Sequence, residues 1–197
     1  MNKVNYQLEL DRIISRLEGR PTLLLHSCCG PCSSYVLEYL TQYFDVFLSY
    51  YNPNIQPRAE YDLRLENQRR VLERIPGVTL VDCSYDGQAY DEAVIGLERE
   101  REGGARCTEC FRLRLEYAAR EAKRLGCDYC CTTLTVSPHK DAQRINALGR
   151  EICAKYGVEW LPGDFKKRNG YKRSIELSRE FGLYRQDYCG CLYSKQA

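Results

Sequence analysis

Three small groups of cysteines are the residues of this 197-residue chain whose type and spacing point most directly to chemistry. The first group is Cys28, Cys29 and Cys32, in the pattern C-C-x-x-C. Adjacent side chains of an extended strand point to opposite sides, so Cys28 and Cys29 face one site only where the backbone turns. Gly30 and Pro31 lie within the group and are typical turn residues. We therefore expect these thiols to gather at a turn that does chemistry, rather than only to fill a core.

The second group is the C-x-x-C pair Cys107 and Cys110, at the start of an expected helix over Thr108–Leu125. The positive end of a helix dipole favours thiolate, the form that binds metals. The spacing leaves three interpretations open: half of a zinc site, a thioredoxin-like dithiol, or two cluster ligands. Four-cysteine zinc sites normally use two C-x-x-C pairs, which Cys28-Cys29 fits poorly. Thiolates from two loops on one rim, Cys28, Cys29, Cys107 and Cys110, suit a [4Fe–4S] cluster.

The third group is Cys189-Gly190-Cys191, close to the C-terminus. A C-x-C pair can close a small, strained disulfide, and strained disulfides tend to be redox-active. The alternative is a flexible tail with incidental cysteines, against which the flanking Tyr188 and Tyr193 favour an ordered segment. The other cysteines are expected to be mainly structural, with Cys130 or Cys131 an alternative contact to the metal site; they are Cys83, Cys127, Cys130, Cys131 and Cys153.

Composition gives these cysteines their chemical context. The chain is 44% hydrophobic and 28% charged, as is ordinary for a globular protein, and has no apolar run long enough to span a membrane. Its first 20 residues mix charged and apolar side chains and lack the apolar core of a signal peptide. We expect a cytoplasmic protein with no membrane partner. In that reducing compartment, 12 cysteines indicate metal binding or redox chemistry more than disulfides.

Two polar segments are candidates for substrate binding. The segment Thr132–Lys140 is a polar loop after an expected strand and is suited to phosphate or substrate; His139 within it is an acid, a ligand or simply a surface residue. A basic stretch surrounds Asn169-Gly170 and is either a nucleic-acid contact or an ordinary solvated face. Its cations are Lys166, Lys167, Arg168, Lys172 and Arg173.

An alternation of strands and helices must position these groups. The expected strands are Thr22–Leu25, Phe44–Tyr51, Val78–Val81, Asp128–Leu134 and Val158–Leu161. The expected helices are Val4–Leu17, Ser33–Leu40, Ala59–Arg74, Tyr90–Arg101, Thr108–Leu125, Asp141–Tyr156 and Ser174–Phe181. This order predicts a single-domain α/β fold, a parallel sheet flanked by helices. We assign residues 1–20 to an N-terminal helical extension and residues 21–197 to one metal-binding catalytic domain that ends in the C-x-C tail.

The first expected strand leads into a loop that lacks a nucleotide-binding signature. Ligands of such sheets bind beyond the carboxyl ends of the strands, so the Cys28–Cys32 and Thr132–Lys140 segments should be neighbours. A phosphate-binding loop here would be rich in glycine and serine, with backbone N–H groups facing the phosphate. Cysteines occupy that place, and neither a Walker A motif nor G-x-G-x-x-G occurs. ATP or NAD binding is therefore not supported.

Four blocks together resemble the QueH family of epoxyqueuosine reductases, and the likeness runs from Leu23 to Ser194. They are HSCCGPCS (26–33), RCTECFRLRL (106–115), TTLTVSPHKD (132–141) and GDFKKRNGYKRSIELSREFGLYRQDYCGCLYS (163–194). The resemblance implies a HUP-type, Rossmann-like fold. It also implies the last step of queuosine synthesis, in which epoxyqueuosine at the wobble position of tRNA loses its epoxide oxygen by two-electron reduction. The partners are then tRNA carrying epoxyqueuosine and an unidentified electron donor.

The resemblance also implies roles for individual cysteines. The family's [4Fe–4S] ligands correspond to Cys28, Cys29, Cys107 and Cys110, and its redox-active pair to Cys189 and Cys191. It further implies a mononuclear iron beside the cluster, for which Cys32 is our candidate contact. For the acid that protonates the epoxide oxygen, the candidates are Asp187 and Tyr188, which adjoin the C-x-C pair.

Three competing functions remain open at this point. One is a zinc-stabilised tRNA-binding module, which would be colourless after anaerobic purification where an iron–sulfur protein is brown. Another is a thiol–disulfide oxidoreductase that uses Cys107 and Cys110 and is unaffected by chelators. The last is an ATP-dependent tRNA thiolation enzyme of related fold, which the missing phosphate loop disfavours.

Overall fold

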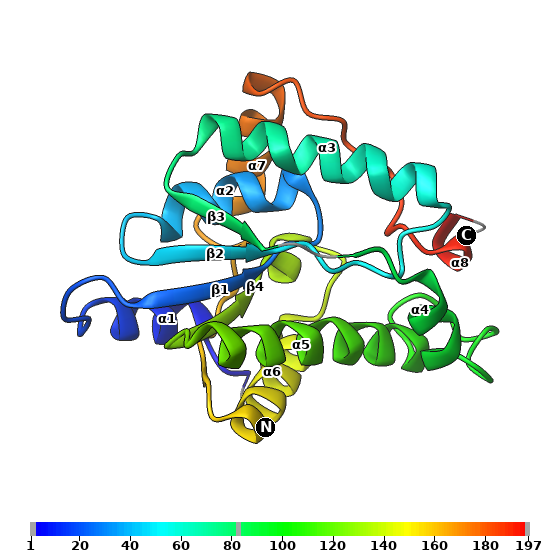
Figure 1. The fold of residues 1–197 in the computed structure, drawn as a ribbon, viewed down its shortest axis with the longest axis horizontal. Helices are drawn as coiled ribbons and strands as arrows, with labels where there is room; N and C mark the ends of the chain where they lie inside the picture. Colours follow the sequence, from blue (N-terminus) through cyan, green and yellow to red (C-terminus); the bar gives the residue numbers. More distant parts are fainter. Residues whose placement is uncertain (1–2, 82–83, 196–197) are drawn as a thin grey trace.

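The computed structural model describes residues 3–81 and 84–195, in which a five-stranded parallel sheet forms the centre of the molecule (Figure 1). The strand order is β3-β2-β1-β4-β5. The strands are β1 (Thr22–His26), β2 (Asp45–Ser49), β3 (Val78–Val81), β4 (Tyr129–Thr132) and β5 (Glu159–Trp160). The expected parallel α/β fold is confirmed. Cys83 lies outside the described residues.

Helices cover both faces of this sheet. The helices are α1 (Tyr6–Ile14), α2 (Gly30–Leu40), α3 (Arg58–Arg74), α4 (Gly87–Ala93), α5 (Ala105–Leu125), α6 (Ala142–Tyr156), α7 (Gly170–Glu180) and α8 (Leu192–Lys195), with a 3₁₀ turn, η1, at Thr133–Val136. Figure 1 shows α2, α3 and α7 on one side of the sheet, and α5 and α6 on the other. Within the described chain, no helix is both long and apolar enough to cross a membrane.

The central strand β1 belongs to two cores because its side chains alternate between the faces of the sheet. Leu23 and Leu25 pack with the apolar residues of α2, and Leu10 of α1 joins the same cluster. Leu24 points the other way, into the cluster built by α5 and α6. All three leucines of the strand are fully buried. A strand with both faces covered is therefore fixed firmly, and so is the loop that leaves its carboxyl end.

Close packing between α6 and β5 fixes the far side of the sheet. Gly149 of α6 faces Trp160, and a Cβ at this glycine would lie 2.3 Å from the indole Cε2. The indole Nε1–H donates to Asn146 Oδ1 at 3.0 Å, so the ring is held by a hydrogen bond as well as by packing. Because Gly149 has no side chain, α6 can pack closely against Trp160 of β5.

Two expected elements differ from the structure. The expected strand Asp128–Leu134 ends at Thr132, because the Thr132 hydroxyl accepts from the Leu134 N–H at 3.2 Å and starts the turn η1. The expected helix Tyr90–Arg101 is instead the shorter α4, which Asp86 caps by accepting from the Ala89 N–H. The side chains of Thr132 and Asp86 bond to the backbone locally and fix where η1 and α4 begin, which hydrophobic spacing does not reveal.

Candidate metal and redox site

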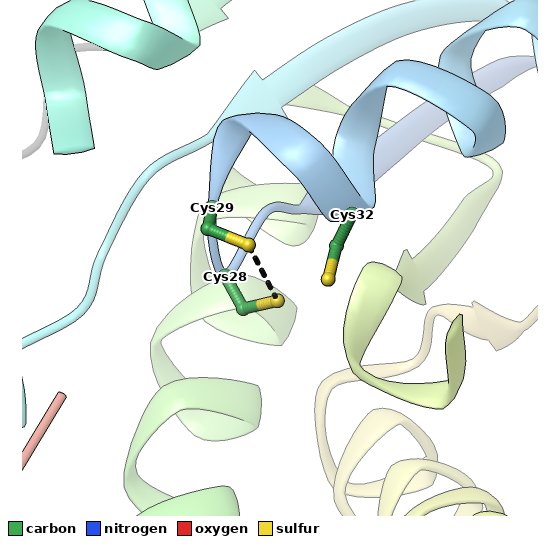
Figure 2. A group of neighbouring side chains, drawn as sticks. All are labelled: Cys28, Cys29 and Cys32. Carbon is green, nitrogen blue, oxygen red and sulfur yellow. Dashed lines mark hydrogen bonds between the residues drawn. The ribbon is translucent and has the colours of Figure 1, made fainter. Parts of the chain in front are cut away.

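The turn between β1 and α2 brings Cys28, Cys29 and Cys32 together, and we call these three residues the cysteine triad. Their sulfur atoms all lie within 4.8 Å of one another, and Cys28 Sγ is 3.9 Å from Cys29 Sγ (Figure 2). Cys29 is the extended N-cap residue of α2, and Pro31 lies in the first turn of that helix. The backbone thus turns as the sequence predicted, and both adjacent thiols face one site.

A glutamine from α3 holds this turn in place. The fully buried Gln68 accepts hydrogen bonds through Oε1 from Ser27 Oγ at 2.6 Å and Ser33 Oγ at 2.8 Å. These two serines flank the cysteine triad on either side. Gly30 is needed at the same contact, because a Cβ there would lie 3.0 Å from the backbone oxygen of Asn67. The start of α2 is therefore fixed against α3 by both hydrogen bonds and close packing.

Contacts among the three thiols shift their pKa values in different directions. Hydrogen bonds from Cys28 and Cys32 lower the pKa of Cys29 well below its usual value, against the opposing effect of burial. Hydrogen bonds with Cys28 and Cys29 raise the pKa of Cys32 well above its usual value, and the hydrogen bond with Cys29 raises the pKa of Cys28. One thiolate stabilised by two thiols is an electron-rich, soft donor set at the positive end of a helix, suited to a thiophilic metal.

The loop after β4 contacts the triad. This was predicted, because the Cys28–Cys32 and Thr132–Lys140 segments both follow the carboxyl ends of strands. The backbone N–H of Cys28 donates to Thr133 Oγ1 at 3.0 Å, and that hydroxyl lies 3.3 Å from Cys28 Sγ. Further along the loop, Lys140 Nζ lies 3.5 Å from Cys189 Sγ. The negative charge of Cys189 raises the pKa of Lys140, against the effect of burial. The loop thus joins the triad to the C-terminal tail.

The pair Cys107 and Cys110 lies in the first turns of α5, where Cys107 packs against the same core as Cys28 of the triad. Cys110 is buried in a small cluster with Cys191, Tyr90 and Val94. Burial raises the pKa of Cys110 to about 12, and burial also raises the pKa of Cys107. The charges of Cys189 and Cys191 act on both thiols. The seven candidate cysteines therefore form two neighbouring sets, the triad on one side and Cys107, Cys110 and the tail pair on the other.

The C-terminal tail is an ordered strap over the site. The guanidinium of Arg64 donates through Nη1 to the Cys189 carbonyl at 3.1 Å and through Nη2 to the Tyr188 carbonyl at 3.4 Å. The N–H of Gln56 donates to the Gly190 carbonyl at 3.0 Å. Gly190 has φ +123°, a conformation that other residues rarely adopt. These bonds turn Cys189 toward the cavity, whereas Cys191 is buried.

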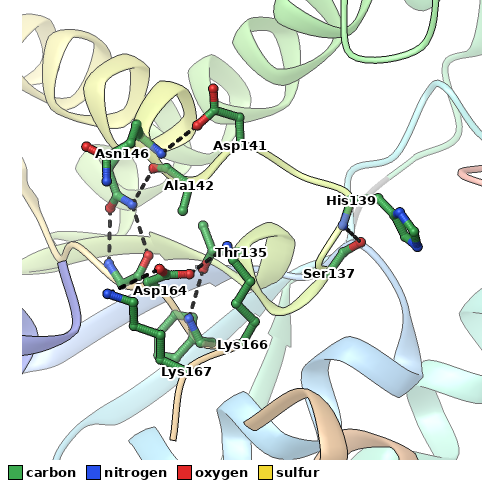
Figure 3. A network of polar contacts seen from close by, with 12 residues as sticks. Thr135, Ser137, His139, Asp141, Ala142, Asn146, Asp164, Lys166 and Lys167 are labelled. Atoms are coloured by element: carbon green, nitrogen blue, oxygen red, sulfur yellow. Dashed lines mark hydrogen bonds and ion pairs between the residues drawn. The ribbon is translucent and has the colours of Figure 1, made fainter. Parts of the chain in front are cut away.

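A cavity of about 680 Å³ opens between the triad, the loop after β4, α7 and the tail. The cysteines that line it are Cys28, Cys29, Cys32 and Cys189. Asp187 and Tyr188 line it as well, and so does the exposed His139, whose N–H donates to Ser137 Oγ (Figure 3). All the cysteines of the described chain are free thiols. Most of the side chains that the sequence suggested as reactive groups thus line this one cavity.

The cations of the basic stretch form ion pairs with acidic side chains of the same chain. Lys166 and Lys167 both pair with Asp164, at 2.7 and 3.8 Å (Figure 3). Lys172 is the most exposed of the five, with 76% of its side chain exposed, and Glu176 lies 4.0 Å away. Arg168 pairs with Asp11, and Arg173 with Glu38 and Glu180. Arg168 therefore links the segment before α7 to α1, and Arg173 links α7 to α2.

Several residues at this site were not singled out in the sequence. Gln68 and Arg64 come from α3 and support the triad and the tail. Gln186 reaches the triad from the tail, where its hydrogen bond helps to lower the pKa of Cys29. Arg114 lines the cavity from α5. Only Arg114 carried a sequence signal, since it follows Cys107 and Cys110 by seven and four residues and so shares their helix face.

The chemistry of the donor set decides which metal groups fit. Thiolates are the ligands of zinc and of iron–sulfur clusters, whereas Mg²⁺ and Ca²⁺ prefer oxygen. The described chain offers three clustered sulfur atoms at the triad and further thiols on α5. The residues present therefore fit an iron–sulfur group by donor type, and they fit zinc by the same criterion.

Comparisons with known proteins complete this description. Residues 23–197 match the family model described as "Epoxyqueuosine reductase QueH". The chain is 44% identical over 202 residues to the protein of that name from Staphylococcus epidermidis, covering 98% of this chain and 85% of that protein. It is 41% identical to that of Streptococcus pyogenes serotype M1, covering 98% and 78%, and 35% identical to that of Thermotoga maritima, covering 88% and 90%.

A solved structure supports the fold. The chain is similar to the U34-tRNA thiolase NcsA from Methanococcus maripaludis, solved with its [4Fe-4S] cluster, at a TM-score of 0.61. The likeness covers 96% of this chain and 67% of that chain, at 14% sequence identity. At that identity the similarity confirms the Rossmann-like architecture and carries no residue roles.

Proposed function

Because this chain belongs to the QueH family of epoxyqueuosine reductases, we propose that it reduces epoxyqueuosine to queuosine in tRNA, the last step of queuosine biosynthesis. In this reaction the epoxide takes up two electrons and two protons, its oxygen leaves as water, and an alkene remains. The observation that carries the proposal is the family match over residues 23–197, which includes every cysteine of the site. tRNA is a cytoplasmic substrate, so the proposal places the protein in the cytoplasm.

A [4Fe–4S] cluster, when bound, supplies electrons one at a time to this chemistry. Cys28, Cys29, Cys107 and Cys110 are the proposed ligands, and Cys32 the proposed contact to an adjacent mononuclear iron. The close approach of the triad sulfurs supports a shared role for Cys28, Cys29 and Cys32. Support for Cys107 and Cys110 comes from their position on the face of α5 that carries Arg114, which lines the same cavity.

Iron and acid-labile sulfide per chain test the cofactor. We expect anaerobically purified protein to be brown and to hold both elements, and we expect Cys29→Ser and Cys110→Ser to lose them. Cys153→Ser is the matched control, since Cys153 is equally buried but lies in the α5–α6 core, and it should keep wild-type iron. A colourless wild-type protein holding zinc would support the zinc-binding tRNA module instead.

The Cys189 and Cys191 pair is proposed to store or relay the two electrons. Cys189 borders the cavity that the triad lines, and Cys191 is buried beside Cys110, so the pair connects that cavity with Cys110. The test is single-turnover reduction with Cys189→Ser and Cys191→Ser, driven by a chemical reductant that replaces the unidentified donor. We expect both rates to fall by at least tenfold. Wild-type rates in both variants would show that the pair is not a required carrier.

Protonation of the leaving oxygen needs an acid at the cavity wall. Asp187 and Tyr188 both line the cavity beside Cys189, which supports either as the donor. Tyr188 also contacts the guanidinium of Arg64, 4.9 Å from its ring centroid, and burial raises the pKa of Tyr188. Asp187→Asn and Tyr188→Phe separate the two: the variant that loses the reaction, with iron content unchanged, identifies the donor.

The tRNA must bring a base out of the anticodon stack to reach this cavity. Of the basic stretch proposed to contact its phosphates, Lys172 is the cation least engaged within the chain. Arg185 lines the cavity, and its hydrogen bonds within the described chain go to neutral oxygens of α7, Ser174 O and Ser178 Oγ. We expect Lys172→Gln and Arg185→Gln each to weaken tRNA binding and to lower its salt dependence by about one counterion. Affinity that does not change with salt would contradict this part of the proposal.

A further inference from the structure

Among the described residues, the buried arginine Arg114 has no carboxylate to compensate its charge, and its guanidinium lies 5.6 Å from the centroid of the Phe111 ring. Its side chain is 2% exposed, yet it lines the cavity between the two cysteine sets. Nε donates to the Cys110 carbonyl at 3.1 Å, and Nη1 lies 3.5 Å from Asn52 Oδ1. Nη2 is buried and has no hydrogen-bond partner among the residues that the structure describes. Both acceptors are neutral, and no ion pair to a carboxylate of residues 3–81 or 84–195 holds this guanidinium.

Two other arginines are about as deeply buried, and each makes more polar contacts within the chain than Arg114 does, although Arg106 Nε also lacks a partner among the described residues. Arg64 is 2% exposed and pairs with Glu60 at 2.7 Å, besides its bonds to the tail. Arg106 is 3% exposed and donates through Nη1 to carbonyl oxygens of the loop before α5, while its guanidinium covers the ring of Tyr193 at 4.5 Å. Arg114 has neither a carboxylate nor such a set of carbonyls. A buried charge without a counter-charge is strongly unfavourable.

The negative groups that Arg114 does face are the cysteines. Burial alone would lower the pKa of Arg114, but the charges of Cys110, Cys189 and Cys28 outweigh burial and raise it. Cysteines bind metals as thiolates, so a metal group held by these cysteines brings negative charge to the cavity that Arg114 lines. Such a group would supply the counter-charge that Arg114 lacks among the described residues.

We propose that Arg114 is a positioning residue for the metal centre: its guanidinium compensates the negative charge of the thiolate-bound group and thereby raises the reduction potential of that group. This inference rests on the proposed iron–sulfur function. The reduced form carries one more negative charge than the oxidised form, so a fixed cation nearby stabilises the reduced form more. Lys140, which lies against Cys189, supplies a second cation that lines the same cavity.

The test is an anaerobic redox titration of the iron-loaded protein, followed by visible absorption and electron paramagnetic resonance. Arg114→Gln removes the charge but keeps a group that can donate to the Cys110 carbonyl, and Arg114→Lys keeps the charge. Arg112→Gln is the matched control on the same helix, since Arg112 is partly exposed and pairs with Glu109 and Glu151 at the surface. Iron and sulfide per chain are measured in every variant.

We expect Arg114→Gln to lower the equilibrium constant for reduction by about tenfold, which for a one-electron couple is about 59 mV more negative. Arg114→Lys and Arg112→Gln should stay near the wild-type potential. An Arg114→Gln protein with full iron and an unchanged potential would overturn the inference. Wild-type protein without iron would instead overturn the proposed function, and this inference with it.

Variants that fail to fold still distinguish the charge of Arg114 from its shape. If Arg114→Gln does not fold while Arg114→Lys folds with the wild-type potential, the charge at this position is what the centre requires, which supports the inference. If Arg114→Lys fails as well, or folds with the potential shifted, the shape and hydrogen bonds of the guanidinium matter rather than its charge, and the inference is wrong.

Discussion

Replacing Gln68 by leucine tests whether the cysteine triad depends on its hydrogen-bonded support. Gln68 Oε1 accepts from Ser27 Oγ at 2.6 Å and from Ser33 Oγ at 2.8 Å, and the residue is fully buried. Leucine has similar size and no acceptor. The two hydroxyl groups then lose their short bonds inside the protein, next to Cys28 and Cys32 in the chain.

The size of this effect depends on the hydrogen bonds that Ser27 and Ser33 can still make in the variant. Ser33 Oγ also lies 3.0 Å from the Gly30 carbonyl, and Ser27 Oγ lies 3.4 Å from the Cys29 carbonyl. Each hydroxyl can turn to that second acceptor, so the loss is about 1 kcal/mol for each bond rather than the full cost of an unsatisfied buried group. We expect Gln68→Leu to lower the free energy of unfolding by about 2 kcal/mol.

Urea unfolding of the wild-type and variant proteins measures this difference. Gln88→Leu is the control, since Gln88 is exposed on α4 and bonds only to Glu92 at the surface, and its change should stay within about 0.5 kcal/mol. We also expect Gln68→Leu to hold less iron, because the turn that gathers the sulfurs is looser. Unfolding energies that are equal in Gln68→Leu and Gln88→Leu would refute the claim that this glutamine supports the turn.

Three further predictions address pH and close packing. Burial lowers the pKa of His26 to about 4 from an ordinary 6.5, so between these pH values the unfolded chain binds more protons than the folded chain. The free energy of unfolding should therefore fall by up to about 3 kcal/mol as the pH drops from about 6.5 to 4. Calorimetry should show this contribution of His26 in the wild type and not in His26→Gln. Gly149→Ala places a methyl group against Trp160, so its thermal unfolding should indicate about 1–3 kcal/mol of destabilisation. Gly190→Ala strains the tail at φ +123°, and faster protease cleavage near Cys189, with unchanged global stability, is the expected sign; equal cleavage would contradict it.

The sequence predicts the centre of this fold well because the responsible signals are local. The apolar run that contains Leu23, Leu24 and Leu25 has both faces buried, and Gly30 and Pro31 mark the turn that follows. Strand order and the closeness of the loops after β1 and β4 then follow from the general geometry of parallel sheets. The cysteine triad was therefore predictable from a few adjacent residues.

Long-range pairing was not predictable in the same way. The cations Arg168 and Arg173 are paired by Asp11 and Glu38, which are more than a hundred residues away in sequence. A composition count shows a basic stretch, and only the folded chain shows that its charge is largely neutralised. Arg114 was missed for another reason. A charged residue on an amphipathic helix is normally assigned to the solvent-facing side, although Arg114 follows Cys107 by seven residues and Cys110 by four and so lies on their side of the helix.

The measurement that tests the central claim most directly is the fate of the modified base. tRNA carrying epoxyqueuosine is incubated anaerobically with iron-loaded protein and a chemical reductant, then digested to nucleosides and analysed by mass spectrometry. We expect epoxyqueuosine to lose the mass of one oxygen atom and become queuosine with wild-type protein and with Cys153→Ser, and to stay unchanged with Cys29→Ser. Epoxyqueuosine that persists with iron-replete wild-type protein and reductant, or full conversion by Cys29→Ser, would contradict this expectation.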